Sequence, residues 1–349
     1  MTPFAFIEPS LRALNVQVQD LQLADAGALA RRRYPNLSTD RPALIGPLAG
    51  ADQRVDLQAV LRQAYPDTHA VILICHTDGT PPALRSLPLA QLGRPSTDVG
   101  TCLLYVPPLP HPGALETFQN TVARLRAPDG CPWDRKQTHR SLRQGFQEES
   151  YEVLDALDQG DPELLKEELG DILLHILLQT HIAGELGEFR FSDVIRYVNA
   201  KIVHRHPHVF ADVQVDGIDE ILVNWETLKQ QEKESRAGLE ETPPSALDGI
   251  SPAMPALARA QSIQRHVDRM GVVAEEVEQL AVRIVAALQR LPASVDGEQV
   301  LGNLLFDLAN LSRKLGIDAE GALREANSRF ERRYRDLEKG MASGSSLPS

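Results

Sequence analysis

The sequence contains few cysteines and fewer basic than acidic residues. Its three cysteines, Cys75, Cys102 and Cys131, are widely spaced and form no Cys-x-x-Cys pair. We therefore predict neither a disulfide framework nor a zinc site. The formal net charge is -12 at pH 7. Such an excess of negative charge argues against nucleic acids and anionic membranes as partners.

Long apolar runs are also missing from the chain. We find no stretch of about 18 consecutive apolar residues, the length that a membrane-spanning helix requires. The first residues, MTPFAFIEPSLRAL, lack the basic region and apolar core of a secretion signal. We therefore predict a cytoplasmic protein without membrane spans, and the length of 349 residues allows two or three domains.

The pattern of apolar residues changes near residue 110. Short apolar runs bounded by turn residues predict strands at 41–46, 69–75 and 101–108, and helical spacing predicts a helix at 56–65. These elements indicate a small α/β unit. The segment VPPLPHPGAL (106–115) then carries four prolines, which are typical of a linker.

Helical spacing dominates the rest of the sequence, in two blocks separated by a proline-containing segment at 236–252. The predicted helices are 114–126, 138–158, 162–185, 192–205, 218–235, 253–270, 274–290, 297–315 and 318–339.

The two helical blocks resemble each other in sequence. QEESYEVL (147–154) matches AEEVEQLA (274–281), and KEELGDILLHIL (166–177) matches EQVLGNLLFDLA (298–309). VNAKIVHRHPHVF matches ANSRFERRYRDLE in the same order. We interpret this self-similarity as a decayed tandem duplication.

Residues 148–171 hold ten carboxylates and a single lysine. Residues three apart share a helix face, so Glu149 and Glu152 project together, as do Glu168 and Asp171 on the next helix. The turn at 160–162 makes the two helices antiparallel and brings both pairs to a similar depth.

Apolar positions adjoin these acidic residues, which places part of the cluster at the interface between the helices. A solvated acidic face is the alternative for an isolated EExxE motif. Converging carboxylates repel one another, so a divalent cation is the simplest compensation, and oxygen ligands favour Mg2+ or Mn2+. Mg2+ is commonly bound together with substrate phosphates. A di-iron bundle would need two Glu-x-x-His motifs, which these helices lack.

Four motifs then occur in a fixed order: GCPWD (130–134), EESYE (148–152), ELGD (168–171) and RHPHVFAD (205–212). Together they resemble the MazG family of nucleoside triphosphate pyrophosphohydrolases, over about residues 114–340. The resemblance implies an all-α fold with a core like a four-helix bundle, completed by homodimerisation. It also implies Mg2+-dependent hydrolysis of a nucleoside triphosphate to the monophosphate and pyrophosphate, with water attacking the α-phosphorus.

The resemblance also implies roles for individual residues. The metal ligands would be Glu149, Glu152, Glu168 and Asp171, with Glu148 as the catalytic residue that orients the attacking water. The substrate-binding residues would be Trp133, Lys201, Arg205, Trp225 and Lys229. From the residues alone, Lys201 and Arg205 could also be a solvated basic pair, and Trp133 could staple a loop to the core. We interpret His204, His206 and His208 as helix-end and packing residues.

The sequence departs from the family pattern in the second block. Gln279, Val300 and Asn303 occupy three of the four ligand positions, and none of them supplies the charge that holds Mg2+. We therefore expect a catalytically dead repeat that serves packing or dimerisation.

The N-terminal unit departs from the pattern of a second family. SLPLAQLGR (86–94) and LLYVPPLP (103–110) are similar to the C-terminal half of a tetrapyrrole methylase domain. The Gly-rich half that binds S-adenosylmethionine has no counterpart, so we expect no such cofactor and a structural or interaction role.

The expected architecture is therefore multidomain, a small α/β unit followed by tandem all-α MazG-like domains. Residues 1–110 form the truncated methylase-like domain, 114–235 the active MazG-like domain, and 251–340 the degenerate repeat. The leading function is a nucleoside triphosphate pyrophosphohydrolase. The alternatives are a narrower dUTP or dCTP pyrophosphatase and a non-catalytic nucleotide-sensing or dimerisation module.

Overall fold

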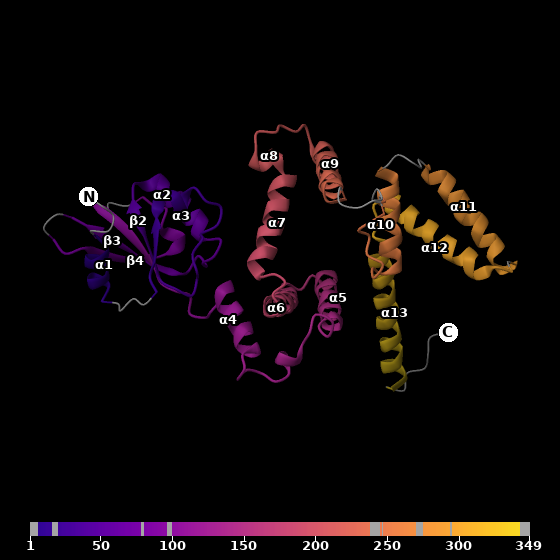
Figure 1. The fold of residues 1–349 in the computed structure, drawn as a ribbon, viewed down its shortest axis with the longest axis horizontal. Coiled ribbons are helices and arrows are strands. Elements are labelled where there is room, and N and C mark those ends of the chain that lie inside the picture. Colours follow the sequence, from indigo (N-terminus) through magenta and orange to yellow (C-terminus); the bar gives the residue numbers. More distant parts are fainter. Residues whose placement is uncertain are drawn as a thin grey trace. The chain divides into compact units, whose positions relative to one another are not determined.

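The computed structural model describes residues 6–15, 20–77, 80–95, 100–237, 245, 247–269, 275–293 and 295–342. The chain divides into two compact units, Met1–Val194 and Ile195–Ser349, and each is described by itself (Figure 1).

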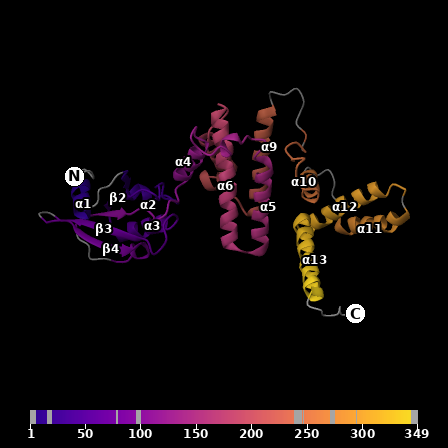
Figure 2. The ribbon, with the colours of Figure 1, turned by 90° about the horizontal axis from the view of Figure 1, so that it is seen from below.

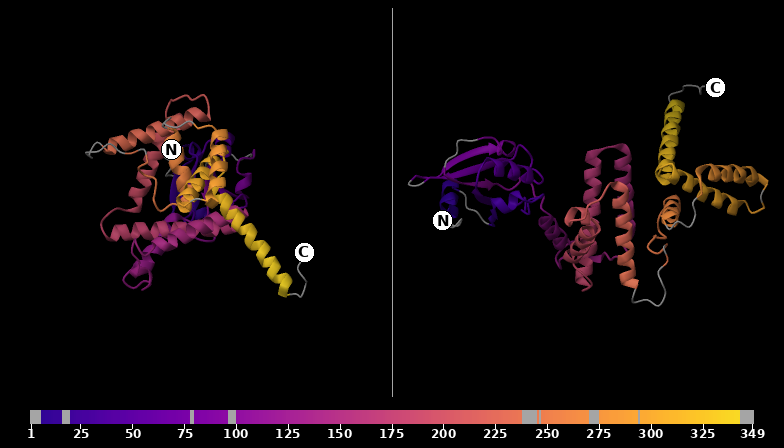
Figure 3. Two further views of the ribbon diagram at one scale, coloured as in Figure 1. Left: turned by 90° about the vertical axis from the view of Figure 1, so that its right-hand side faces the viewer. Right: turned by 90° about the horizontal axis from the view of Figure 1, so that it is seen from above.

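The first unit begins with a five-stranded mixed sheet (Figure 3). In spatial order its strands are β1 (Gln22–Asp25), β2 (Ala43–Leu48), β5 (Thr101–Val106), β3 (Ala70–His76) and β4 (Ala83–Pro88). The pair β1–β2 is parallel, and the other neighbouring pairs are antiparallel. The three predicted strands are confirmed with small shifts. The short β1 and the largely exposed β4 carry too weak an apolar pattern for prediction.

Helices cover the two faces of this sheet unequally. On one face α2 (Ala26–Ala30) and α3 (Ala51–Leu61) contribute Leu29, Leu57 and Leu61 to the larger apolar core. Alternate strand residues point to the other face, where Ile7 and Leu14 of α1 (Ile7–Leu14) pack. The structure thus contains the predicted small α/β unit, although α3 begins at Ala51, before the predicted start at residue 56.

Cys75 and Cys102 form a disulfide between β3 and β5. The two residues are direct partners in the antiparallel register, with Cα atoms 4.1 Å apart. The prediction that the chain has no disulfide is therefore wrong. The reason is physical, since strand register decides the pairing of residues that are 27 positions apart in sequence. Cys131 is free.

The first unit continues with three helices, α4 (Leu115–Arg126), α5 (Arg143–Gln159) and α6 (Pro162–Glu185), and a short 3-10 turn at Asp134–Lys136. α5 and α6 form the predicted antiparallel hairpin (Figure 2). Gly160 ends α5 in the left-handed conformation, with φ of 66°. The Asp161 carboxylate caps α6 by accepting hydrogen bonds from the backbone N–H groups of Glu163 and Leu164, at 2.9 and 3.2 Å.

Helix α5 begins five residues later than predicted. Thr138 and Ser141 bond reciprocally, each backbone N–H donating to the other hydroxyl at 2.9 and 3.1 Å. These bonds offer the backbone an alternative to the helix, so residues 138–142 form turns. Buried Val122, Leu177 and Ile182 join α4 to α6 in one apolar cluster.

The second unit is helical over its described residues. Helix α7 (Phe191–Arg205) leads into it, and the further helices are α8 (Pro207–Phe210), α9 (Ile218–Ala237), α10 (Ala256–Arg269), α11 (Val277–Arg290), α12 (Gly297–Lys314) and α13 (Ala319–Ala342). Every helix predicted after residue 113 is found, with ends shifted by a few residues. No helix in the described part of the chain is long and apolar enough to cross a membrane.

Helices α11 and α12 form a second hairpin around Leu280, Ile284 and Leu304. Helix α10 joins α12 through two buried amides. Gln261 donates to the Ala309 carbonyl at 3.2 Å, and Gln264 donates to the Phe306 carbonyl at 2.7 Å.

Candidate functional site

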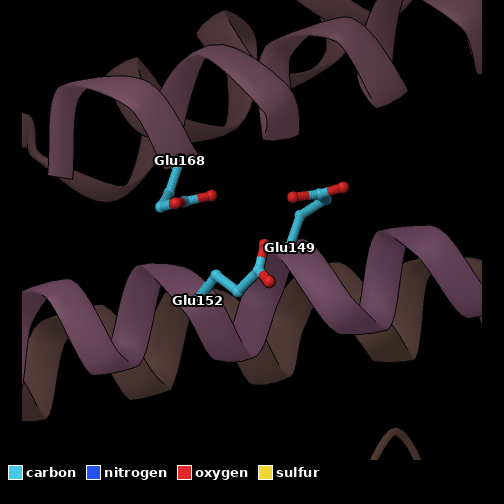
Figure 4. A group of neighbouring side chains, drawn as sticks. All are labelled: Glu149, Glu152 and Glu168. Carbon is cyan, nitrogen blue, oxygen red and sulfur yellow. The ribbon is translucent and has the colours of Figure 1, made fainter. Parts of the chain in front are cut away.

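Three carboxylates converge between α5 and α6. Glu149 and Glu152 project from α5, and Glu168 faces them from α6 (Figure 4). One oxygen of each carboxylate lies within 4.8 Å of the others. Glu149 and Glu152 are three residues apart and therefore lie on the same face of α5. The capped start of α6 fixes where that helix begins, and so it sets which residue of α6 lies opposite this pair.

The electrostatics of this group are unfavourable to three negative charges. Burial and the neighbouring Glu152 raise the pKa of Glu149. Burial and the charge of Glu152 likewise raise the pKa of Glu168. The half-buried Asp171 adds to both shifts, although it lies outside the group of three. The hairpin therefore holds acidic side chains together against their repulsion.

The group fits a divalent cation by its chemistry. Within the described residues, none of its three carboxylates pairs with a lysine or arginine side chain. No other set of at least three histidine, cysteine or acidic side chains in the described ranges brings its ligand atoms together in this way. Oxygen donors alone suit Mg2+ or Mn2+ better than zinc.

Glu148 stands beside this group. It is exposed, and its carboxylate accepts a hydrogen bond from the Gln144 side chain at 2.9 Å. Its position one residue before Glu149 turns it about 100° around the helix, so it borders the group rather than joining it.

A second cluster of predicted residues lies in the second unit. The Arg205 guanidinium lies over the Trp225 ring at 5.1 Å from its centroid, and the Lys229 ammonium lies at 5.0 Å. Glu232 accepts hydrogen bonds from Nε and Nη2 of Arg205 at 3.2 and 2.5 Å. The bond from Arg205 is the main cause that lowers the pKa of Glu232 to about 2. His204 approaches the same carboxylate at 3.0 Å.

This arrangement brings together three of the five predicted substrate residues. It also contains Glu232, which the sequence reasoning missed. The signal was available, because Trp225, Lys229 and Glu232 are spaced by four and three residues and so share one face of α9.

The two remaining substrate candidates are described separately, each within its own unit. Lys201 is half-buried on α7, one turn before Arg205. Trp133 is 66% exposed in the turn before α5, which is not the burial of a side chain that staples a loop to a core. His206 bonds to the carbonyl of Ile202 at 2.7 Å, a helix-end contact like the one predicted.

In the second hairpin, α11–α12, an arginine side chain lies between acidic side chains. Arg283 of α11 donates to Asp307 of α12 at 2.9 and 2.7 Å, and it also bonds to Glu275. Hydrogen bonds to Asp307 are the main cause that raises the pKa of Arg283. The described residues of this hairpin contain no converging group of three acidic side chains.

Comparisons with known proteins bear on this geometry. A model of the MazG nucleotide pyrophosphohydrolase domain matches residues 137–210. The chain is 38% identical over 227 residues to the nucleoside triphosphate pyrophosphohydrolase/pyrophosphatase MazG of Thermotoga maritima, covering 64% of this chain and 85% of that protein. It is 39% identical over 237 residues to the nucleoside triphosphate pyrophosphohydrolase of Escherichia coli K12, covering 65% and 88%.

Two further similar proteins differ in how much of this chain they cover. "Uncharacterized protein YabN" of Bacillus subtilis is 31% identical over 347 residues, covering 96% of this chain and 69% of that protein. The crystal structure of a mazG-related protein from Thermotoga maritima is 28% identical and covers 33% of this chain and 99% of its own, with a TM-score of 0.30. From the identity and coverage of the sequence relatives, the chain belongs to the MazG family of nucleotide pyrophosphohydrolases and is a hydrolase acting on phosphoric anhydrides.

Proposed function

We propose that the chain hydrolyses nucleoside triphosphates to nucleoside monophosphates and pyrophosphate in an Mg2+-dependent reaction, with water attacking the α-phosphorus. The observation that carries this proposal is the convergence of Glu149, Glu152 and Glu168 without a lysine or arginine partner in the described residues. The names of the relatives, which are nucleoside triphosphate pyrophosphohydrolases, support the substrate class.

The α5–α6 hairpin would hold the cation. Glu149, Glu152 and Glu168 would ligate it directly, with Asp171 as the fourth ligand, and Mn2+ would be accepted by the same oxygens. When bound, the ion supplies charge neutralisation at the phosphates and a more acidic water. Glu148, exposed at the border of the group, would accept a proton from the attacking water and orient it.

The cationic residues of α7 and α9 would bind the substrate. Arg205, which is paired with Glu232, and Lys229 lie over Trp225, and Lys201 lies one turn from Arg205 on the same helix. Guanidinium and ammonium groups suit the phosphate oxygens of a nucleotide. Trp133, exposed before α5, offers a ring on which a base can stack.

The other parts of the chain have proposed roles without catalysis. The active MazG-like domain would be residues 114–235. Residues 251–340 would be a degenerate MazG-like repeat, and this repeat would serve packing or dimerisation. Its charge pair between Arg283 and Asp307 supports this role, because the acids there already have a cation. Residues 1–110 would be a truncated tetrapyrrole-methylase-like domain that binds no S-adenosylmethionine. The homodimeric state and the cytoplasmic location stay predictions.

The reaction is tested by phosphorus NMR of the products from ATP and Mg2+. The expected products are AMP and pyrophosphate, and Glu152→Gln should stop their formation because an amide cannot supply the ligand charge. Release of orthophosphate by the unaltered chain would show that a different bond is cleaved.

Substrate breadth needs a separate measurement. Pyrophosphate release from each of the common ribonucleoside and deoxyribonucleoside triphosphates should show several substrates within about tenfold of one another, since a hydrophobic or stacking contact discriminates weakly. Turnover of dUTP or dCTP alone would favour the narrower enzyme.

A further inference from the structure

His175 lies beside the three converging carboxylates and is a buried polar side chain, with 9% of its surface exposed. It sits on α6 one turn after Asp171 and two turns after Glu168, on the same face of the helix. Its Nε2 is 4.0 Å from Oε1 of Glu149. Its Nδ1 is buried and has no hydrogen-bond partner among the residues that the structure describes.

The imidazole of His175 projects from α6 and packs against α5. A Cβ atom added at Gly145 would lie 2.9 Å from Cε1 and 3.1 Å from Nε2 of His175. Only glycine therefore leaves room for the ring in this orientation. The Phe146 ring meets it edge to face, with centroids 5.9 Å apart and an interplanar angle of 86°. The ring is thus packed tightly in a place where its Nε2 lies 4.0 Å from Oε1 of Glu149, close enough for an electrostatic interaction but beyond hydrogen-bond distance.

The unpaired Nδ1 distinguishes this side chain from a satisfied core histidine. Burying a polar atom without a partner costs free energy, and native proteins keep few such atoms. The tautomer with hydrogen on Nε2 places the donor on the nitrogen that lies 4.0 Å from Glu149, and it leaves a lone pair at Nδ1. A donor at this point reduces the repulsion that drives Glu149 away from Glu152 and Glu168.

We infer that His175 is a positioning residue, which holds the Glu149 carboxylate within the group of Glu149, Glu152 and Glu168 and thereby sets the affinity for the divalent cation. The inference rests on the proposed function, because it assumes that these carboxylates bind the cation. His175 acts through Glu149 and makes no contact with substrate in this role. Groups that orient a metal ligand typically change metal affinity by about 10- to 100-fold when they are removed.

The test measures Mn2+ binding to the full chain without nucleotide, by titration calorimetry and by the electron paramagnetic resonance signal of free Mn2+. His175→Leu keeps a side chain of similar size without a donor, and His175→Gln keeps an amide donor. We expect His175→Leu to weaken Mn2+ binding by about tenfold or more and His175→Gln to restore it to within about threefold. Circular dichroism should show folded chains in both cases.

Rescue by glutamine separates positioning from two other roles. If the ring were only packing, both variants would bind Mn2+ as the unaltered chain does, and the inference would be overturned. If His175 were itself a ligand, glutamine would fail to restore binding, because a neutral amide is a poor substitute for imidazole nitrogen. That result would also overturn it.

A second perturbation leaves His175 in place and moves its ring. Gly145→Ala adds a methyl group at 2.9 Å from Cε1, so the ring must shift away from its position. Gly170→Ala is the matched control, since it makes the same change on α6, where the added Cβ meets no described atom within 4 Å other than the nearby backbone of its own helix. We expect weaker Mn2+ binding in Gly145→Ala alone. Equal binding by the two alanine variants would contradict the positioning role.

Failure of the proposed function gives a different result. If the unaltered chain binds no Mn2+ and Glu152→Gln changes nothing, the cation assignment itself is wrong. If the unaltered chain binds Mn2+, Glu152→Gln abolishes the binding and His175→Leu leaves it intact, the cation site stands and only the inference about His175 falls.

Discussion

The hairpins α5–α6 and α11–α12 have matching sequences, but they differ in whether their acidic side chains are paired with a basic side chain. In the first, Glu149, Glu152 and Glu168 converge with no lysine or arginine partner among the described residues. In the second, Arg283 bonds to both Glu275 and Asp307. One hairpin concentrates uncompensated charge, and the other compensates its charge with a side chain of its own.

The alignment of the two repeats explains how the second arrangement arises. Arg283 stands where the first repeat has Ala156, and Asp307 stands where it has His175. A long helical side chain points toward the N-terminus of its helix, so the guanidinium reaches back to Glu275, which matches Glu148. The comparison shows two solutions among the described residues, acidic side chains that converge in the first hairpin and acidic side chains paired with an arginine in the second. The second repeat carries its compensating charge within the chain.

Removal of ligands from the first hairpin should have the largest effect. The double variant Glu149→Ala, Asp171→Ala loses two of the proposed oxygen ligands and leaves the second repeat intact. We expect pyrophosphate release to fall by more than about a hundredfold, beyond the loss seen when only a supporting group is removed. A continuous assay for pyrophosphate measures the effect.

The matched control is Glu276→Ala, since Glu276 aligns with Glu149 and is exposed. It should change the rate by less than about twofold, as expected for a surface substitution away from the site. Retained activity in the double variant would mean that the second repeat catalyses the reaction, and the comparison would break.

Mg2+ should stabilise the first hairpin selectively. A ligand at 100 times its dissociation constant adds about 2.7 kcal/mol to the folded state, which corresponds to about a hundredfold slower exchange of amides whose opening releases it. We expect this slowing in peptides of α5 and α6 and none in α11 and α12. Hydrogen exchange with mass spectrometry, with and without Mg2+, measures both hairpins in one sample. Equal protection of the two hairpins would contradict a cation site confined to the first.

The sequence predicted the first hairpin better than its surroundings because its signals are local. Gly160, Asp161 and Pro162 end one helix and begin the next by rules that act within one turn. Once the hairpin is antiparallel, the spacing of Glu149 and Glu152 suffices to place both opposite Glu168.

Features that depend on distant partners were not predictable in the same way. The Cys75–Cys102 disulfide follows from the register of β3 and β5, and the Arg283–Asp307 pair follows from the packing of α11 on α12. The position of Glu232 on the same face of α9 as Trp225 and Lys229 could be read from the spacing, but its bond to Arg205 could not, because that partner lies on another helix. In each case the residue types were visible, and the contact required the three-dimensional arrangement.

The internal cation of the second hairpin can be removed directly. Arg283→Met leaves Glu275 and Asp307 without their partner, with side chains 18% and 16% exposed. Because the arginine side chain is itself 46% exposed, we expect a modest cost of about 1 to 2 kcal/mol in the opening free energy of α11–α12. Hydrogen exchange measures the change, and pyrophosphate release should be unaffected.

Arg329→Met provides the control for this variant. Arg329 pairs with Glu325 on the exposed face of α13, so its loss should cost less than about 0.5 kcal/mol. Equal effects of the two variants would show that the pair in the second hairpin is an ordinary surface contact. The difference between the two hairpins would then come only from the converging carboxylates of the first.

The smallest expected effect is a dependence of the first hairpin on pH. The pKa values of Glu149 and Glu168 are raised above 4.5, first by burial and then by neighbouring carboxylates. Between pH 4.5 and the raised values, the folded hairpin binds more protons than the unfolded chain, so its stability falls as pH rises through this window. Hydrogen exchange of the metal-free chain, corrected for intrinsic rates, should show this slope in α5 and α6. Glu168→Gln should flatten it, because the amide does not titrate and relieves the repulsion on Glu149. A slope that persists unchanged in this variant would mean that the converging carboxylates are not its source, whereas a flattened slope ties the charge of the first hairpin to its stability.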